Sequence, residues 1–359
     1  MSRGTKAIVR LSALAHNLER IHQLAPKANV WAVVKANAYG HGAVAVANYL
    51  QDRVSGFAVA TLDEALELRE SGIQQRILLL EGVTSEGQSL LAAEMGFDLV
   101  VHQQQQLAWL ERLHITGLQL WLKLDTGMHR LGLPLDGIEA TIARLRAHPA
   151  GFQLGLMSHF ASADEPDSPW LAQQRQRLAG IQQQFPDLPC SFANSAAVVG
   201  MPDTHADWIR PGIMLYGASP FAERQAQQLG LRPVMSLVAP VIALRQVPKG
   251  DAVGYGASWV AERDSQIATL AVGYADGYPR SVQAGTPVAI NGQLAPLVGR
   301  VSMDLITIDV TGLSVAVGDL AELWGEQVSV DQVAAAAGTL GYELLTRRSL
   351  RVPLAYTLV

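Results

Sequence analysis

Apolar and polar positions alternate in blocks along the first two thirds of the chain. After a first apolar run at 6–12, eight more follow, at 30–37, 56–61, 76–82, 97–101, 118–125, 152–160, 190–195 and 208–217. The stretches between them, such as 62–72 and 169–185, carry apolar residues at helical spacing. Because the eight runs are apolar at successive positions, they are typical of parallel strands covered on both faces. Eight strands alternating with helices predict a parallel (β/α)8 barrel.

The pattern changes near residue 230, where apolar runs come closer together and are broken by Gly, Pro and Asn. Strand-like runs lie at 233–247, 265–275, 286–299 and 303–311, and one late helix is predicted at 330–341. Asn291-Gly292 is a strong signal for a two-residue hairpin. The polar segment 221–233 suits a linker. We therefore expect a barrel domain at 1–228 and a mostly antiparallel β-rich domain at 229–359, and the first strand at 6–12 is able to pair with the second domain.

Composition restricts the partners of the chain. The 359 residues are 49% hydrophobic, which is enough to fill the cores of two domains. The formal net charge of −5 is spread over interspersed charges of both signs, which argues against a nucleic-acid-binding surface. Small molecules are therefore the expected ligands. The glutamine-rich pieces at 103–106 and 173–184 are interpreted as solvated helix faces.

Cysteine usage and hydropathy predict a cytoplasmic location. Cys190 is the single cysteine, which excludes an internal disulfide framework and fits a reducing compartment. Its setting in an apolar run favours strand packing over a reactive thiol. The N-terminus has no long apolar region, and no apolar run reaches the ~20 residues needed to span a bilayer. We expect no membrane partner.

The first candidate for chemistry is Lys35, which ends an apolar run and precedes the turn Gly40-His41-Gly42. Burial disfavours a charged ammonium and lowers its pKa, so an amine in this place is a plausible nucleophile or base. Schiff-base formation with a carbonyl cofactor fits this chemistry best. The alternative is a lysine at a strand end that reaches solvent.

Eight motifs in order carry a family resemblance over almost the whole length. They are VVKANAYGHG (33–42), KLDTGMHRLG (123–132), SHF (158–160), WIRPGIMLYG (208–217), VGYGASW (253–259), GYADGYPR (273–280), GRVSMD (299–304) and GYELLT (341–346). Together they resemble the alanine racemases, which are pyridoxal-phosphate enzymes. The resemblance implies interconversion of L-alanine and D-alanine, for cell-wall synthesis or for alanine catabolism.

Candidate side chains gather where predicted strands end. They are Lys35, Lys123, Arg130, His159, Ser195 and Arg210. In a (β/α)8 barrel the carboxyl ends of the strands meet at one mouth, so these residues are expected to converge. The structural alternative for each is an ion pair or a cap at the barrel rim.

The resemblance assigns two bases on opposite faces of the substrate. Lys35 resembles the lysine that carries the cofactor, and Tyr255 resembles the opposing tyrosine, which comes from the partner subunit. His159 and Arg210 match the residues linked to that tyrosine by hydrogen bonds. An always-protonated guanidinium at Arg210, placed against the pyridine nitrogen, would leave that nitrogen unprotonated and favour racemisation over transamination. In isolation, a tyrosine flanked by glycines is also typical of a turn.

The remaining assignments concern the phosphate, the substrate and the entrance. Ser195, Gly212, Ile213, Tyr39 and Tyr342 match the family's phosphate contacts. Core packing is the alternative for Tyr342. The resemblance also implies that Lys123 is a carbamylated lysine that holds Arg130 against the cofactor. Arg130 and Met303 match substrate-binding positions. Asp304 and Tyr274 match residues that support the entrance. The sequence leaves the carbamylation of Lys123 open.

Because Tyr255, Tyr274 and Met303 lie in the second domain, the resemblance implies a head-to-tail homodimer with shared active sites. Three alternatives stay open: a broader amino-acid racemase acting on serine or basic amino acids, a non-catalytic pyridoxal-phosphate carrier, and a decarboxylase. The complete second domain argues against the carrier, and Arg210 argues against the decarboxylase. The sequence has no zinc-ligand spacing, dinucleotide fingerprint or P-loop, so no metal is expected.

Overall fold

The computed structural model describes residues 3–113 and 115–358. It divides into two compact units, which are described separately. The barrel unit consists of residues 18–38 and 42–215, and the β-rich unit consists of residues 1–17, 39–41 and 216–359. Within the described residues, no helix is both long and apolar enough to cross a membrane.

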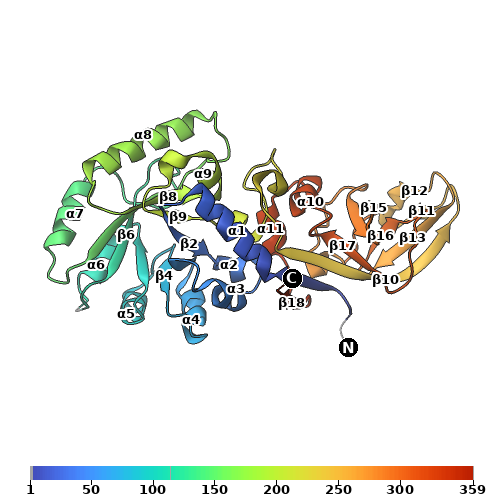
Figure 1. The fold of residues 1–359 in the computed structure, drawn as a ribbon, viewed down its shortest axis with the longest axis horizontal. Helices are drawn as coiled ribbons and strands as arrows, with labels where there is room; N and C mark the ends of the chain where they lie inside the picture. Colours follow the sequence, from blue (N-terminus) through green and yellow to red (C-terminus); the bar gives the residue numbers. More distant parts are fainter. Residues whose placement is uncertain (1–2, 114, 359) are drawn as a thin grey trace. The chain divides into compact units, whose positions relative to one another are not determined.

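The barrel unit is built on a closed parallel barrel (Figure 1). Its strands are β2 (Asn29–Val33), β3 (Gly56–Val59), β4 (Arg76–Leu79), β5 (Asp98–Val101), β6 (Gln119–Lys123), β7 (Gln153–Met157), β8 (Cys190–Asn194) and β9 (Trp208–Arg210). Neighbours in the chain are neighbours in the barrel, and β2 pairs with β9 to close it. The predicted fold class is confirmed, and all eight predicted barrel strands are present.

Helices follow the strands around the barrel. They are α3 (Ala43–Leu50), α4 (Leu62–Glu70), α5 (Glu86–Glu94), α6 (Gln104–Leu110), α7 (Ile138–Ala147), α8 (Pro169–Gln184) and α9 (Ser195–Gly200), with α1 (Leu11–Leu24) before β2 and α2 (Lys35–Tyr39) directly after it. The reading of the glutamine-rich pieces as solvated faces is wrong at two positions. Gln106 and Gln174 are buried, and their amides donate to the loop oxygens of Val83 and His159.

Tryptophans fill the interior of the barrel. Trp31 stacks on Trp208 with ring centroids 4.4 Å apart, and Trp121 meets Trp31 edge to face. The neighbouring strand positions are glycines: a Cβ at Gly56 would clash with the Trp31 ring, and one at Gly155 would clash with the Trp121 ring. Large side chains opposite glycines let the layers interdigitate at the density of a packed core.

Several strands are shorter than the apolar runs that predicted them. The run 208–217 forms a strand only as far as Arg210, because Pro211 has no N–H to continue the ladder. A 3-10 turn, η2 (Ile213–Tyr216), follows. Shortening the strands leaves the polar ends of these runs in loops, where side chains reach the barrel mouth.

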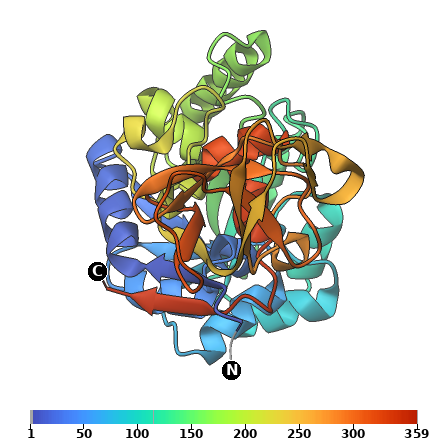
Figure 2. The same ribbon diagram turned by 90° about the vertical axis from the view of Figure 1, so that its right-hand side faces the viewer.

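The β-rich unit contains a sheet in the order β13-β16-β15-β14-β17-β10-β1-β18. The bounds are β1 (Lys6–Arg10), β10 (Met235–Val247), β13 (Ser265–Leu270), β14 (Pro287–Ile290), β15 (Gln293–Val298), β16 (Ile306–Asp309), β17 (Leu320–Trp324) and β18 (Leu354–Thr357). The long strand β10 pairs with β1 and β17 in its first half and with β13 in its second half. The sheet therefore curls back on itself, as the orange and red strands in Figure 2 show.

Two details of the β-rich unit bear on the predictions. Asn291 and Gly292, both at positive φ, link β14 to β15, so the predicted hairpin is confirmed. The prediction of one late helix is too low, because the structure has α10 (Val330–Ala337) and also α11 (Gly341–Thr346). Gly338 ends α10 in the left-handed conformation, which separates the two helices. The first strand, β1, pairs antiparallel with β10 and parallel with β18.

Candidate active site

Lys35 opens a left-handed turn directly beyond the end of β2. Ala36, Asn37 and Ala38 have φ of 53–54° and ψ of 48–52°. Left-handed backbone costs non-glycine residues about 1–2 kcal/mol each, so this turn needs support from its surroundings. Within the turn, Ala38 N–H donates to Val34 O at 2.8 Å, and the Asn37 side-chain oxygen accepts from Ala43 N–H at 2.7 Å.

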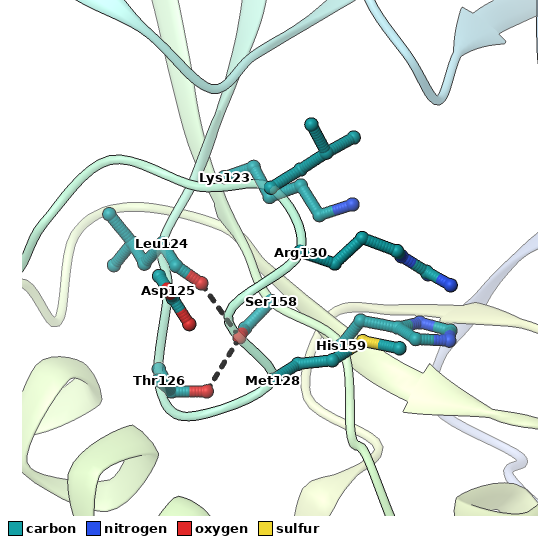
Figure 3. Close-up of a pocket in the computed structure, with 9 residues that line it drawn as sticks. Lys123, Leu124, Asp125, Thr126, Met128, Arg130, Ser158 and His159 are labelled. Atoms are coloured by element: carbon teal, nitrogen blue, oxygen red, sulfur yellow. Dashed lines mark hydrogen bonds between the residues drawn. The ribbon is translucent and has the colours of Figure 1, made fainter.

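Lys123 and Arg130 are brought together by a loop that starts where β6 ends. Leu133 N–H donates to Lys123 O, and Asp125 N–H donates to Leu133 O, which closes the base of the loop. The Asp125 carboxylate accepts from the N–H groups of Gly127 and His129, each at 3.0 Å. In Figure 3 the side chains of Lys123, Arg130 and His159 extend to the same side of a small pocket that they line.

Arg210, at the end of β9, is only 6% exposed. Its guanidinium donates to Ser191 O at 2.7 Å, Ser158 O at 2.6 Å and Phe192 O at 3.2 Å. Burial lowers its pKa to about 10, so the group stays cationic at neutral pH. Within the described residues, these acceptors are uncharged oxygens rather than a carboxylate. Arg210 is therefore a buried cation held by backbone oxygens of β8 and of the residue after β7.

His159 lies beside this cation, just beyond β7. Its Nδ1 is 3.2 Å from the Arg210 guanidinium. Because a guanidinium can only donate, Nδ1 must be the unprotonated nitrogen. Burial, followed by the positive charges of Arg210 and Lys123, holds the pKa of His159 well below its usual value. The imidazole is therefore neutral at physiological pH.

Ser195 and Gly212 meet at the ends of β8 and β9. The Ser195 hydroxyl accepts from Gly212 N–H at 2.9 Å, and Ile213 follows Gly212 at the start of η2. β8 and β9 are the seventh and eighth strands of the barrel. Loops after these two strands form the usual phosphate site of (β/α)8 enzymes. Because its oxygen accepts from Gly212, the Ser195 hydroxyl can donate its own proton to an anion in this place.

The lysines at the mouth have depressed basicity. Burial, and then the Arg130 charge, lower the pKa of Lys35, while the carboxylates of Glu81 and Glu64 oppose this shift. Burial, and then the charges of Arg210 and Arg130, lower the pKa of Lys123 to about 8. Cations that repel one another at one mouth favour binding of an anionic ligand.

Tyr255 lies in the β-rich unit on the short turn η4 (Tyr255–Ala257), between strands β11 (Ala252–Val253) and β12 (Trp259–Val260). Its side chain is 71% exposed. The flanking Gly254 and Gly256 both have positive φ, and a Cβ on Gly256 would touch the Arg300 guanidinium. The turn therefore presents an aromatic hydroxyl outward from a defined backbone.

The entrance candidates of the β-rich unit lie side by side. Tyr274 N–H donates to Ser302 O at 3.0 Å, and Ala275 N–H donates to Met303 O at 2.9 Å. Gly273 has no room for a Cβ, because the carbonyl oxygen of Met303 occupies that space. Asp304 forms an ion pair with Arg351 at 2.6 Å. Met303 and Tyr274 are both exposed.

The two tyrosines predicted to contact phosphate also lie near each other. The rings of Tyr39 and Tyr342 are 6.1 Å apart. Tyr39 stacks on Tyr216 with centroids 4.8 Å apart. Burial raises the pKa of Tyr39, so its hydroxyl remains a hydrogen-bond donor at all physiological pH values.

Sequence reasoning missed several residues of this site. Glu64 accepts a hydrogen bond from the N–H of Ala36, the residue after Lys35, at 2.7 Å. Gln174 supports the loops carrying Thr126 and His159. A signal for Glu64 was present in the pattern Thr61-x-x-Glu64, which is typical of a helix capping box. No local pattern pointed to Gln174.

Comparisons with known proteins cover nearly the whole chain. The family model "Alanine racemase, N-terminal domain" matches residues 9–220, and "Alanine racemase, C-terminal domain" matches residues 234–356. The chain is 51% identical over 352 residues to the alanine racemase of Stutzerimonas stutzeri, covering 98% of each protein. It is 50% identical over 353 residues to a protein of Pseudomonas aeruginosa named "Alanine racemase, biosynthetic", again covering 98% of each.

Solved structures agree with these matches. The crystal structure of the biosynthetic alanine racemase from Pseudomonas aeruginosa gives a TM-score of 0.94 at 49% identity, covering 99% of this chain and 100% of the other. The alanine racemase structure from Acinetobacter baumannii gives a TM-score of 0.95 at 44% identity, covering 99% of each chain.

Proposed function

The chain belongs to the alanine racemase family, and from that premise we propose that its barrel mouth interconverts L-alanine and D-alanine with Lys35 and Tyr255 as the two bases. Members of this family are pyridoxal-phosphate-dependent isomerases. The observation that carries the residue assignment is the convergence of Lys35, a cationic cluster and the Ser195 hydroxyl at one set of strand ends.

The donor set of the mouth fits pyridoxal phosphate. An aldehyde needs an amine that is neutral part of the time, and burial lowers the pKa of Lys35. A phosphate needs several donors, and the Ser195 hydroxyl lies where barrels usually bind phosphate. The Gly212 N–H, which donates to that hydroxyl in this structure, is the proposed second donor. Ile213, Tyr39 and Tyr342 complete the proposed phosphate set. When bound, the cofactor supplies a conjugated ring that withdraws electrons from the Cα–H bond of an attached amino acid.

Racemisation requires a proton to leave one face of Cα and another to arrive on the opposite face. Because its pKa is lowered, the Lys35 amine releases a proton at Nζ more readily than an exposed lysine does, and it can take one up again. Tyr255 would act at its phenolic oxygen on the other face. A phenol is a poor base unless nearby cations favour its phenolate. We assign the cation to Arg210 and propose that the neutral His159, which accepts from Arg210, links it to the phenol.

Arg210 has a second proposed role at the pyridine nitrogen. A guanidinium donates hydrogen bonds but does not give up its proton at physiological pH. The nitrogen would therefore stay unprotonated, and charge would stay near Cα. Reprotonation at Cα, which is racemisation, is then favoured over proton transfer elsewhere. The buried carbonyl cage around Arg210 keeps this cation in place.

We propose that Lys123 carries a carbamate that holds Arg130 toward cofactor and substrate. CO2 adds only to a neutral amine, with loss of one proton, and a pKa of about 8 leaves a useful neutral fraction. The addition turns a repulsive Lys–Arg pair into an attractive one.

In the presence of ¹³C-bicarbonate, the protein should therefore show a bound carbamate resonance by ¹³C NMR that Lys123→Ala lacks. The resonance should fade as the pH falls through the pKa of Lys123, because the protonated amine cannot bind CO2. A wild-type spectrum identical to that of Lys123→Ala at every pH would show that Lys123 carries no carbamate.

The β-rich unit completes the proposed site from a second copy of the chain. Tyr255, Tyr274 and Met303 are exposed on that unit, as groups that serve a partner's site would be. We propose a head-to-tail homodimer, with Met303 N–H binding the substrate carboxylate and Asp304 and Tyr274 shaping the entrance. The biosynthetic relative favours supply of D-alanine, and we place this activity in the cytoplasm.

The first test measures racemase activity and identifies the lysine that binds the cofactor. Purified protein with pyridoxal phosphate should convert L-alanine to D-alanine. Borohydride reduction followed by peptide mapping should then place the pyridoxyl group on Lys35, because its amine has a lowered pKa and opens the turn at the mouth. A label on Lys123, which also has a lowered pKa, would overturn the assignment. Parallel assays with serine and lysine measure substrate breadth.

A further inference from the structure

The backbone that follows Lys35 is strained and needs an external support. Ala36, Asn37 and Ala38 are all left-handed, although two of them are alanines without the local side-chain bonds that ease this conformation. Non-glycine residues persist in such regions only when the surrounding structure holds them there. The N–H of Ala36 is the first hydrogen-bond donor after Lys35 along the chain, so its partner determines how the turn leaves the strand.

That partner is the carboxylate of Glu64, in the first turn of α4. Its Oε1 accepts from Ala36 N–H at 2.7 Å, and its Oε2 accepts from Ala60 N–H at 2.7 Å. Ala60 directly follows β3. One carboxylate therefore ties together the backbones that emerge from the first two strands of the barrel, immediately beside Lys35.

A helix cap alone does not explain this placement. In the capping box of α4, the Glu64 side chain should bind Thr61 N–H, but that contact is the longest of the three at 3.4 Å. The two short contacts go instead to Ala36 and Ala60. The carboxylate thus reaches beyond the helix it caps, and its Oε1 binds the strand end that carries the lysine.

We propose that Glu64 is a positioning residue for the reaction, which holds the left-handed turn through Ala36 N–H and supplies a fixed negative charge beside the Lys35 amine. This inference rests on the proposed role of Lys35. Glu64 touches neither the cofactor nor the substrate in this assignment; it acts through the backbone and through its charge.

The charges around Lys35 predict the direction in which its pKa should change when Glu64 is replaced. Arg130 and Arg210 lower the pKa of Lys35 beyond the effect of burial, and Glu81 and Glu64 raise it. The nearby Lys123 is a further cation of the cluster. Glu64→Gln removes one of the carboxylates that oppose these cations, so the pKa of Lys35 should fall further.

The test compares Glu64→Gln with two matched variants on the same element. Thr61→Ala removes the hydroxyl that accepts from Glu64 N–H and so weakens the cap without touching Ala36. Glu67→Gln removes an exposed carboxylate from the same helix. Each full-length protein is freed of cofactor, and its fold is checked by circular dichroism. It is then acetylated at trace levels over a range of pH values, and the acetylation of Lys35 is quantified by peptide mapping.

We expect the labelling profile of Lys35 to move to lower pH in Glu64→Gln and to stay in place in Thr61→Ala and Glu67→Gln. In the holoenzyme, kcat of Glu64→Gln should fall by roughly 10-fold to 100-fold, because a small misplacement of a reacting group slows the reaction by about that factor. KM for alanine should change little. Thr61→Ala should lower the melting temperature while kcat stays near the wild-type value.

A Glu64→Gln profile that coincides with wild type would overturn the proposal, as would an equal shift in Thr61→Ala. Should Glu64→Gln fail to fold, Glu64→Asp keeps the charge but is too short for both backbone contacts. It should lower kcat, and wild-type kcat in that variant would also overturn the proposal. Failure of the Lys35 assignment itself is seen separately, as a pyridoxyl label on another residue.

Discussion

An equimolar mixture of two inactive variants, Lys35→Ala and Tyr255→Ala, should recover racemase activity once their subunits exchange. Each variant alone loses one of the two bases, and a general acid or base contributes on the order of 10²–10⁴-fold. If Lys35 and Tyr255 serve one site from different chains, a heterodimer holds one site with both lesions and one site with neither. Up to half of the sites in those heterodimers should then be active, as measured by D-alanine formation.

The control is a mixture of Lys35→Ala with Lys35→Met, in which no exchange of subunits can assemble a complete site. Exchange is verified by mass spectrometry of differently tagged chains. If heterodimers of Lys35→Ala and Tyr255→Ala form and remain inactive, both bases come from one chain and the shared-site proposal is wrong.

Replacing Arg210 should have the next largest effect. Arg210→Glu would place a carboxylate against the carbonyl oxygens of Ser158, Ser191 and Phe192, which now accept from the guanidinium. An uncompensated buried charge, which this carboxylate would be, typically costs about 3–5 kcal/mol. Urea unfolding of the holoenzyme should show a lower free energy of unfolding by about that amount.

Activity should fall as well, because a carboxylate at this place would let the pyridine nitrogen of the cofactor take up a proton. The variant should racemise slowly and show a new long-wavelength absorbance when alanine is added. Arg210→Lys is the matched control, since it keeps a cation and some donors and should lose less stability and show no such absorbance. Unchanged turnover and spectrum in Arg210→Glu would refute the role at the nitrogen.

Much of the barrel could be predicted from the sequence because its signals are local. Strands buried on both faces are apolar at successive positions, and in the helices between them apolar residues recur every three to four residues. The Asn291-Gly292 hairpin followed from the same kind of signal, since both residues tolerate positive φ. Lys35, Lys123, His159, Ser195 and Arg210 were predicted to sit at strand ends, and the structure places them at or just beyond β2, β6, β7, β8 and β9.

The tertiary structure decided what depends on partners distant in the chain. The long strand β10 pairs with both β1 and β13, a closure that no local pattern encodes. The burial of Gln106 and Gln174 could not be predicted either, because a glutamine looks the same whether its amide meets water or a loop carbonyl.

The same distinction applies to the active site itself. The sequence determined by itself that Lys35 follows a buried strand, because the apolar residues that form the strand directly precede it. Only the tertiary structure placed Glu64, from the helix after the next strand, on the N–H of Ala36. It also enclosed Arg210 in carbonyl oxygens from β8 and from the residue after β7. Hydrophobic periodicity is a property of neighbours in sequence, whereas strain, desolvation and pKa depend on groups that only folding brings together.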